Sequence, residues 1–447
     1  MDPPLTTFAQ TMLRANMADD DIEDVAQTFF EVADEAERVD RKRGGSRPGR
    51  SANLERDREA GAARIYLDYF SDNPVYGDRV FRRRFRMRRE LFKRVVDGVT
   101  ETDPYFEQKY DALGRAGLST LQKAVAVIRI LAYGLPADAV DEYVRIGEST
   151  AAECTIRFCE AVVERFGPEY LRSPTVDDLR RIMDDNARRN FPGMAGSIDC
   201  YHWVWKNCPK AWQGQFRGAK GTSMILEAVA GHDLWIWHMF FGPPGTLNDI
   251  NVLHRSPFLS ALIDGSFPSV EYRVNGHTYT VPYWLADGIY PDWQIFVKSI
   301  PDPQGPARRL FTKLQEAARK DIERAFGVLQ ARFAIIRYAS LYWKREVNGL
   351  LMTAAVILHN MIVEDERHDP NLQADLDFLP NENRPPDPMN PEPYIVIRRH
   401  PRPEALPQGS IVRSKIERYE VIRDKGMHYN LEADLVRHIW NNAGGHL

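Results

Sequence analysis

The sequence has few cysteines, no long apolar run and almost no net charge. Four cysteines in 447 residues are too few for a disulfide scaffold and fit a reducing compartment. No run reaches the ~18 consecutive apolar residues of a membrane span, and the first residues lack the basic-then-apolar order of a signal peptide. We therefore expect neither secretion nor a membrane partner. The length is roughly three times that of a typical ~150-residue domain, so two or three domains are expected.

The small net charge hides a strong segregation of charge. The total of −4 gives no hint of a nucleic-acid partner. Yet residues 1–40 hold eleven acids against two arginines, a net of −9, and residues 41–94 hold seventeen Lys/Arg against seven acids, a net of +10. We expect residues 1–50, an acidic leader and a basic linker, to be disordered, although Phe29 and Phe30 also permit a short amphipathic helix.

A basic helix is predicted further along this basic stretch. In FRRRFRMRRELFKRVV (81–96), apolar residues recur at helical spacing among arginines. The density of arginine favours a phosphate-binding surface or a nuclear-import signal, and a solvated charged face is the alternative. The candidate DNA-binding residues here are Arg82, Arg83, Arg84 and Arg86.

The chain changes character near residue 190. Residues 51–185 read as helices, and a helix, a short helix, a turn with Gly147 and a longer helix outline a helix-turn-helix-like region. Many small helical packings share that outline. Short β-branched and aromatic runs follow and then long helices, so residues 190–366 predict a mixed α/β domain. Residues 369–447 read as a Pro/Asn-rich arm and a C-terminal helix.

Four acids stand out by their positions in this α/β region. Asp199 lies inside GSIDCYHW, Asp249 follows PPGTLN, Asp287 ends TVPYWLAD and Glu323 lies on a long helix. A carboxylate at the end of a buried strand is costly unless it is paired or binds a metal. Two strand ends and a helical Glu can bring three carboxylates to one point, where hard cations such as Mg²⁺ bind. Taken singly, each acid also fits a turn cap or an ion pair, such as Glu323 with Arg319.

Long blocks of the sequence resemble the PIF/Harbinger superfamily of DNA transposases, most closely the plant-type branch. The resemblance covers about residues 75–365. It rests on GSIDCYHWVWKNCPKAW, ILEAVAGHDLWIWHMFFGPPGTLNDINVLHRSPF, YWLADGIYPDW and QEAARKDIERAFGVLQARFAII.

The resemblance implies a fold class and a catalytic triad. It implies α/β architecture with an RNase H-like catalytic core, in which a mixed sheet is flanked by helices, behind the all-helical region. Asp199, Asp287 and Glu323 match the three acids of a DDE triad. Asp249 lies in another family block and is either an additional metal ligand or only the cap of a helix that begins near Ile250.

The expected activity is metal-dependent cleavage and strand transfer of DNA at transposon ends, with two Mg²⁺ or Mn²⁺ ions per site. Lys and Arg near the triad would contact phosphates, namely Arg319, Lys320 and Arg324. The resemblance also implies terminal inverted repeats, target DNA, a Myb-like accessory protein and a nuclear location. A homo-oligomer is expected because two ends must be joined. The alternative is a domesticated protein that binds DNA, chromatin or proteins without strand transfer.

Three further patterns carry weaker alternatives. Cys200, His202 and Cys208 suggest zinc, but alternation on a strand explains them equally well. Five tryptophans could stack on unpaired bases, although their near period-two spacing favours core packing; they are Trp203, Trp205, Trp212, Trp235 and Trp237. His359 and Asn360 are expected to form a satisfied interior pair.

Overall fold

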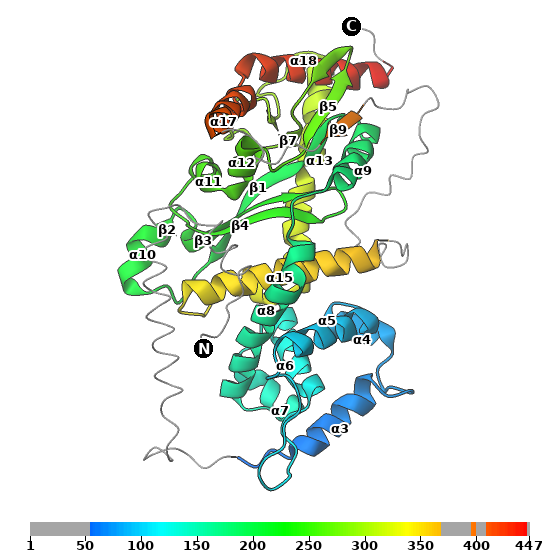
Figure 1. Cartoon of the computed structure of the whole chain (residues 1–447), viewed down its shortest axis with the longest axis vertical. Helices are drawn as coiled ribbons and strands as arrows, with labels where there is room; N and C mark the ends of the chain where they lie inside the picture. Colours follow the sequence, from blue (N-terminus) through cyan, green and yellow to red (C-terminus); the bar gives the residue numbers. More distant parts are fainter. Residues whose placement is uncertain (1–53, 368–394, 399–407, 445–447) are drawn as a thin grey trace. The chain divides into compact units, whose positions relative to one another are not determined.

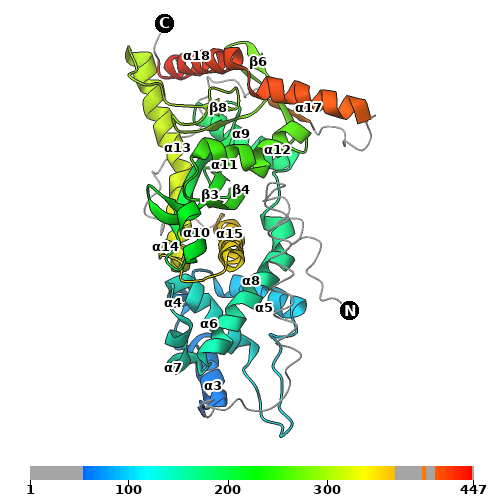
Figure 2. The same ribbon diagram turned by 90° about the vertical axis from the view of Figure 1, so that its left-hand side faces the viewer.

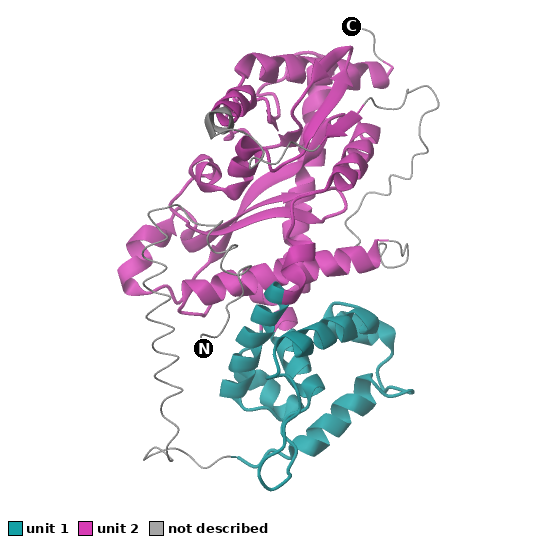
Figure 3. Cartoon of the chain, viewed as in Figure 1, with its two compact units in different colours: residues 1–130, 135–164 teal, residues 131–134, 165–447 magenta. Residues whose placement is uncertain are grey.

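The structure is a computed structural model that describes residues 54–367, 395–398 and 408–444 (Figure 1). The acidic leader, the basic linker and most of the Pro/Asn-rich arm lie outside the described residues. The chain divides into two compact units, one of residues 1–130 with 135–164 and one of residues 131–134 with 165–447 (Figure 3). The mixed α/β character expected from the sequence is confirmed.

Unit 1 is helical throughout its described part. Phenylalanine and tyrosine side chains of its first three helices pack edge to face: the Tyr69 and Phe85 rings lie 5.0 Å apart, and Phe85 and Phe92 5.2 Å. Its elements are α3 (Arg58–Tyr69), α4 (Asp78–Phe85), α5 (Arg89–Thr102), α6 (Thr120–Tyr133), the 3₁₀ turn η1 (Ala137–Val140), α7 (Asp141–Val144) and most of α8 (Glu148–Tyr170).

Unit 2 is built on a mixed sheet. Its central strands are ordered β4-β3-β1-β7-β8, and the two-residue β2 pairs with the start of β3. The β4–β3 and β3–β1 pairs are antiparallel, whereas β1–β7 and β7–β8 are parallel. The strands are β1 (Met194–Val204), β2 (Arg217–Gly218), β3 (Gly221–Ala230), β4 (Ile236–Pro244), β7 (Tyr283–Leu285) and β8 (Phe296–Val297).

Helices cover this sheet. The long α13 runs along it (Figure 2), and the Ser197 hydroxyl on β1 donates to the carbonyl of Ala318 on α13 at 3.3 Å. Three residues further along β1, Cys200 packs against the cluster that contains Val252 of α11, on the opposite face of the sheet. The helices around the sheet are α9 (Val176–Arg188), α10 (Lys210–Phe216), α11 (Asp249–Arg255), α12 (Pro257–Asp264), α13 (Pro306–Arg332), α14 (Ala334–Arg337) and α15 (Arg345–Glu366).

A second, three-stranded sheet and two C-terminal helices complete unit 2. Its order is β6-β5-β9, with β5 (Ser269–Val274), β6 (His277–Tyr279) and β9 (Ile395–Arg398), and α17 (Gln408–Ile422) and α18 (Lys425–Asn442) follow. The β5–β6 hairpin turns at Asn275 and Gly276, both with positive φ, as an Asn-Gly turn requires. Helix α18 is capped by Asp424, whose side chain accepts from the Met427 amide.

One described helix is long and apolar enough to cross a membrane. It is α15, and 72% of its most apolar stretch is buried inside the structure. Its buried His359 and Asn360 make the interior contacts expected of them: His359 Nε2 lies 2.9 Å from the carbonyl oxygen of Leu234, and the Asn360 side chain accepts from the Ile236 amide at 2.9 Å. These contacts are those of a core helix.

Candidate functional site

Asp199 on β1 and Asp287, two residues beyond the end of β7, are close enough for their charges to interact. The parallel pairing of β1 with β7 ends at Ser197 and Leu285, so each acid follows the last paired residue of its strand by two positions. Because side chains alternate along a strand, Asp199 shares the face of Ser197. That is the face on which α13 lies, since Ser197 bonds to Ala318.

Helix α13 brings Glu323 to the same place through Arg319. Arg319 Nη1 lies 3.3 Å from Asp199 Oδ2, and Arg319 Nη2 lies 2.8 Å from Glu323 Oε1. Residues four apart on a helix face the same way, so one guanidinium bridges the strand acid and the helix acid. The three acids of the expected triad are therefore drawn toward one region of unit 2.

Burial and mutual repulsion make Asp199 and Asp249 hard to ionise. The pKa of Asp199 is raised to about 6, mainly by burial and to a smaller extent by the nearby charges of Asp287 and Asp249, although the Cys200 amide and Arg319 act in the opposite direction. Burial also raises the pKa of Asp249, again with Asp287 contributing. Carboxylates crowded in this way gain from a cation placed among them.

Asp249 is the first residue of α11 and not its cap. The Asn248 side chain accepts from the Asn251 amide and caps the helix, so the alternative in which Asp249 only caps this helix is wrong. The nearby thiol of Cys200 acts against burial and lowers the pKa of Asp249. Cys200 belongs to the face of the sheet opposite Asp199, so Asp249 approaches the pair from the α11 side.

The donors suit a hard cation, but the side chains do not form a finished metal site. All four acids offer oxygen ligands, which Mg²⁺ and Mn²⁺ prefer. Across residues 54–367, 395–398 and 408–444, no group of three or more His, Cys, Asp or Glu side chains is arranged to hold a metal ion. The positive charge between Asp199 and Glu323 is the guanidinium of Arg319.

Comparisons with known proteins agree on one family. A model described as a plant transposon protein matches residues 168–370, and a model described as a domain of unknown function matches residues 61–100. "Protein ALP1-like" of Arabidopsis thaliana is 27% identical over 267 residues, 56% of this chain and 62% of that protein. "Protein Antagonist of Like Heterochromatin Protein 1" from the same plant is 26% identical over 269 residues, 55% of this chain and 63% of that protein. No solved structure matches the chain.

These matches support the resemblance of residues 168–370 to a transposase-like family of the PIF/Harbinger type. The match to the plant transposon model contains Asp199, Asp249, Asp287 and Glu323. The chain spans somewhat less than two thirds of the length of the curated relatives.

The candidate DNA-binding arginines near the start of the described chain differ in their exposure and in the contacts that their side chains make. Arg83 is exposed on α4. Arg84 stacks 4.0 Å from the Tyr76 ring centroid and bonds the Tyr69 hydroxyl, and Arg86 Nη1 donates to the carbonyl of Arg83 at 2.9 Å. Arg82 is half-buried.

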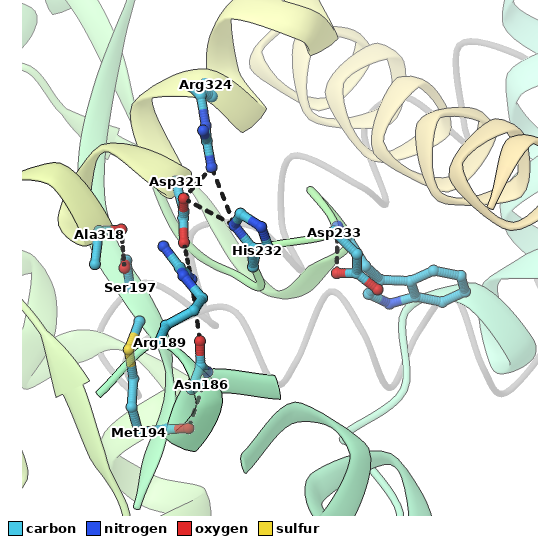
Figure 4. Close-up of polar contacts among 10 residues, drawn as sticks. Asn186, Arg189, Met194, Ser197, His232, Asp233, Ala318, Asp321 and Arg324 are labelled. Atoms are coloured by element: carbon cyan, nitrogen blue, oxygen red, sulfur yellow. Dashed lines mark hydrogen bonds and ion pairs between the residues drawn. The ribbon is translucent and has the colours of Figure 1, made fainter. Parts of the chain in front are cut away.

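On α13, Lys320 is exposed whereas Arg324 belongs to a buried network (Figure 4). Asp321 is fully buried and pairs with Arg324 and, at 2.7 Å, with Arg189 of the segment after α9. His232 Nδ1 lies 3.4 Å from the same carboxylate. Arg324 thus balances a buried charge, and its side chain is only 19% exposed.

Sequence reasoning overlooked Glu227 on β3. It is fully buried opposite Cys200, one carboxylate oxygen lies 3.3 Å from His238 Nε2, and the other has no hydrogen-bond partner within the described part of the chain. The signal was present, because an acid stands alone in the apolar run Ile225–Val229. Burying such a group without full hydrogen bonding is costly.

The weaker alternatives resolve as follows. His202 Nδ1 bonds the Ser223 hydroxyl at 3.2 Å, and no zinc-type cluster occurs among the described residues. Trp203, Trp205, Trp235 and Trp237 are buried, which confirms core packing for these four; Trp212 is half-buried.

Proposed function

We propose that the chain is a metal-dependent DNA nuclease of the DDE type, with an RNase H-like core, which cleaves and transfers DNA strands at transposon ends. One observation carries the proposal: Asp199 and Asp287 each follow the last residue pair of the parallel β1–β7 ladder, and Arg319 of α13 pairs with both Asp199 and Glu323. The sheet order, with the first strand central and a parallel neighbour bearing the second acid, supports the RNase H-like assignment.

The residues fit two divalent cations by donor type. Asp199, Asp287 and Glu323 would hold Mg²⁺ or Mn²⁺, with Asp249 as a further ligand or a support. When bound, the two ions supply activation of the attacking oxygen and stabilisation of the leaving one. Arg319 stands next to the acids, and the exposed Lys320 follows it on α13; both would orient the phosphates of the strand. Inverted-repeat and target DNA, a Myb-like partner, a homo-oligomer and a nuclear location belong to the same proposal.

The test is cleavage of labelled inverted-repeat ends by the purified full chain, with and without an accessory protein. We expect Mg²⁺- or Mn²⁺-dependent products that vanish in Asp199→Asn, Asp287→Asn and Glu323→Gln. Lys415→Gln is a matched control, because this lysine pairs with Asp264 far along the chain from the triad. Products that persist in Asp199→Asn, or need no divalent metal, would contradict the proposal.

A second candidate is a binding factor without strand transfer. Two observations favour it: a relative is named as an antagonist of a heterochromatin protein, and Arg319 already balances two of the acids. Calorimetric titration with Mn²⁺ separates the two. A binding factor would show no Mn²⁺ heat that depends on Asp199, and a nuclease would.

A further inference from the structure

A short loop of unit 2 exposes three large apolar side chains. This aromatic loop, residues 338–344, joins α14 to α15. Trp343 is 66% exposed, and Tyr338 and Leu341 are each 56% exposed. Side chains of this size are normally covered, so an exposed group of them marks an interaction surface.

The loop is held rigidly by the end of β1. The Trp203 indole N–H donates to the Tyr338 carbonyl at 2.8 Å, and the Trp205 indole N–H donates to the Tyr342 carbonyl at 2.7 Å. Asn207 donates to the Leu341 carbonyl at 2.7 Å. Both indoles are buried, so the backbone is fixed while its outer side chains remain exposed. A fixed surface loses little conformational entropy on binding.

Positive charge surrounds the exposed rings. Exposed cations lie beside them on α14, at the end of the loop and at the end of β1, namely Arg337, Lys344 and Lys206, and Glu346 is the nearby exposed acid. Aromatic rings alternating with Lys and Arg are the arrangement that binds unpaired nucleic acid, in which bases stack on rings and phosphates meet cations. A purely apolar protein contact would not need these cations.

The loop borders the same edge of β1 as Asp287. One edge of β1 pairs with β3 from Ser197 to Val204. The other edge pairs with β7 near Ser197 and with Ser340 of the loop at Trp205. At ~3.3 Å per residue, Val204 lies about 17 Å from Asp199 along the strand.

We propose that the aromatic loop binds unpaired bases of a DNA strand, with Trp343 and Tyr338 as the stacking surfaces. The strand would be the one held at the carboxylates; this last statement rests on the proposed function, whereas the binding itself does not.

The test is fluorescence anisotropy of the full chain in EDTA, with a labelled 20-nucleotide oligo-dT and a 20-base-pair duplex. We expect Tyr338→Ala with Trp343→Ala to weaken oligo-dT binding at least tenfold, since each lost stacking contact accounts for about that factor, and to change duplex binding less than twofold. Tyr338→Phe with Trp343→Phe keeps both rings and should bind like the wild type. These side chains are exposed, so the variants should fold, and thermal melting checks that they do.

Leu341→Ala is the matched control. It removes an equally exposed apolar side chain without a ring, and we expect less than a twofold effect on oligo-dT. The proposal is overturned if the wild-type chain does not bind oligo-dT, if the double alanine variant binds it normally, or if Leu341→Ala weakens binding as much as the double alanine variant does, which would indicate an apolar surface without preference for bases. Asp287→Asn should retain oligo-dT binding. If the wild-type chain binds oligo-dT but never cleaves DNA, the proposed nuclease function is refuted and the proposal for the aromatic loop stands.

Discussion

The buried His359 should make the stability of unit 2 depend on pH. Its Nε2 faces the Leu234 carbonyl at 2.9 Å and its Nδ1 faces the Arg332 guanidinium at 3.2 Å. The ring is therefore neutral, with Nε2 as donor and Nδ1 as acceptor. Burial lowers the pKa of His359 from 6.5 to about 3, and the charge of Arg332 acts in the same direction.

The sign of the effect follows from which state binds the proton. Between pH 6.5 and 3 the unfolded chain protonates this histidine while the folded chain does not. The stability is thus fully present above pH 6.5 and is lost as the pH falls toward 3, by about 1.4 kcal/mol per pH unit. From pH 6.5 to 4.5 the free energy of unfolding should fall by roughly 2 kcal/mol from this residue alone.

Urea unfolding of the wild type and of His359→Gln at pH 6.5 and pH 4.5 measures this fall in the free energy of unfolding. Glutamine can still donate to Leu234 but cannot take up the proton, so the difference in stability between wild type and variant should shrink by roughly 2 kcal/mol at pH 4.5. Met361→Leu, a buried change on the same helix, should keep the wild-type pH dependence. Equal pH dependence in wild type and His359→Gln would refute the reasoning.

Three further predictions concern backbone, loop and charge. Gly193→Ala should lower the free energy of unfolding by several kcal/mol, because φ is +87° and the new Cβ would lie 2.2 Å from the Tyr272 ring; normal urea stability would contradict this. Trp205→Phe removes the donor to the Tyr342 carbonyl and should speed hydrogen exchange across the aromatic loop. Arg319→Gln should tighten Mn²⁺ binding about threefold in calorimetry, since a half-exposed ion pair is worth ~0–1 kcal/mol; weaker binding would count against a bridging role.

Local patterns in the sequence predicted the elements well. The apolar run around Asp199 is typical of a strand and forms β1, and the Asn275-Gly276 pair is typical of a hairpin turn and joins β5 to β6, because both depend on residues close in the chain. Boundaries that depend on distant contacts cannot be recognised in this way. Helix α8 runs through Gly167 and Pro168 to Tyr170, whose buried side chain bonds Glu364 of α15.

The candidate site was predictable in its residues but not in its pairing. A strand-end acid can be recognised in the sequence, but the parallel β1–β7 pairing that brings Asp199 near Asp287 joins segments 88 positions apart. The exposed tryptophan was missed for the same reason. Trp343 and the buried Trp205 look equally apolar in sequence, and only the tertiary structure shows that one supports the loop that displays the other.

The position of Arg319 bears most directly on the choice between nuclease and binding factor. A positive charge would relieve the repulsion among Asp199, Asp287 and Asp249. The guanidinium of Arg319 supplies one, but it pairs with only two of the four acids, Asp199 and Glu323. That ion pair is weak, because Glu323 is 45% exposed and such pairs contribute ~0–1 kcal/mol. A divalent cation can contact several of these carboxylates at once and carries twice the charge. The intact acids therefore favour a metal over Arg319, and with it the nuclease.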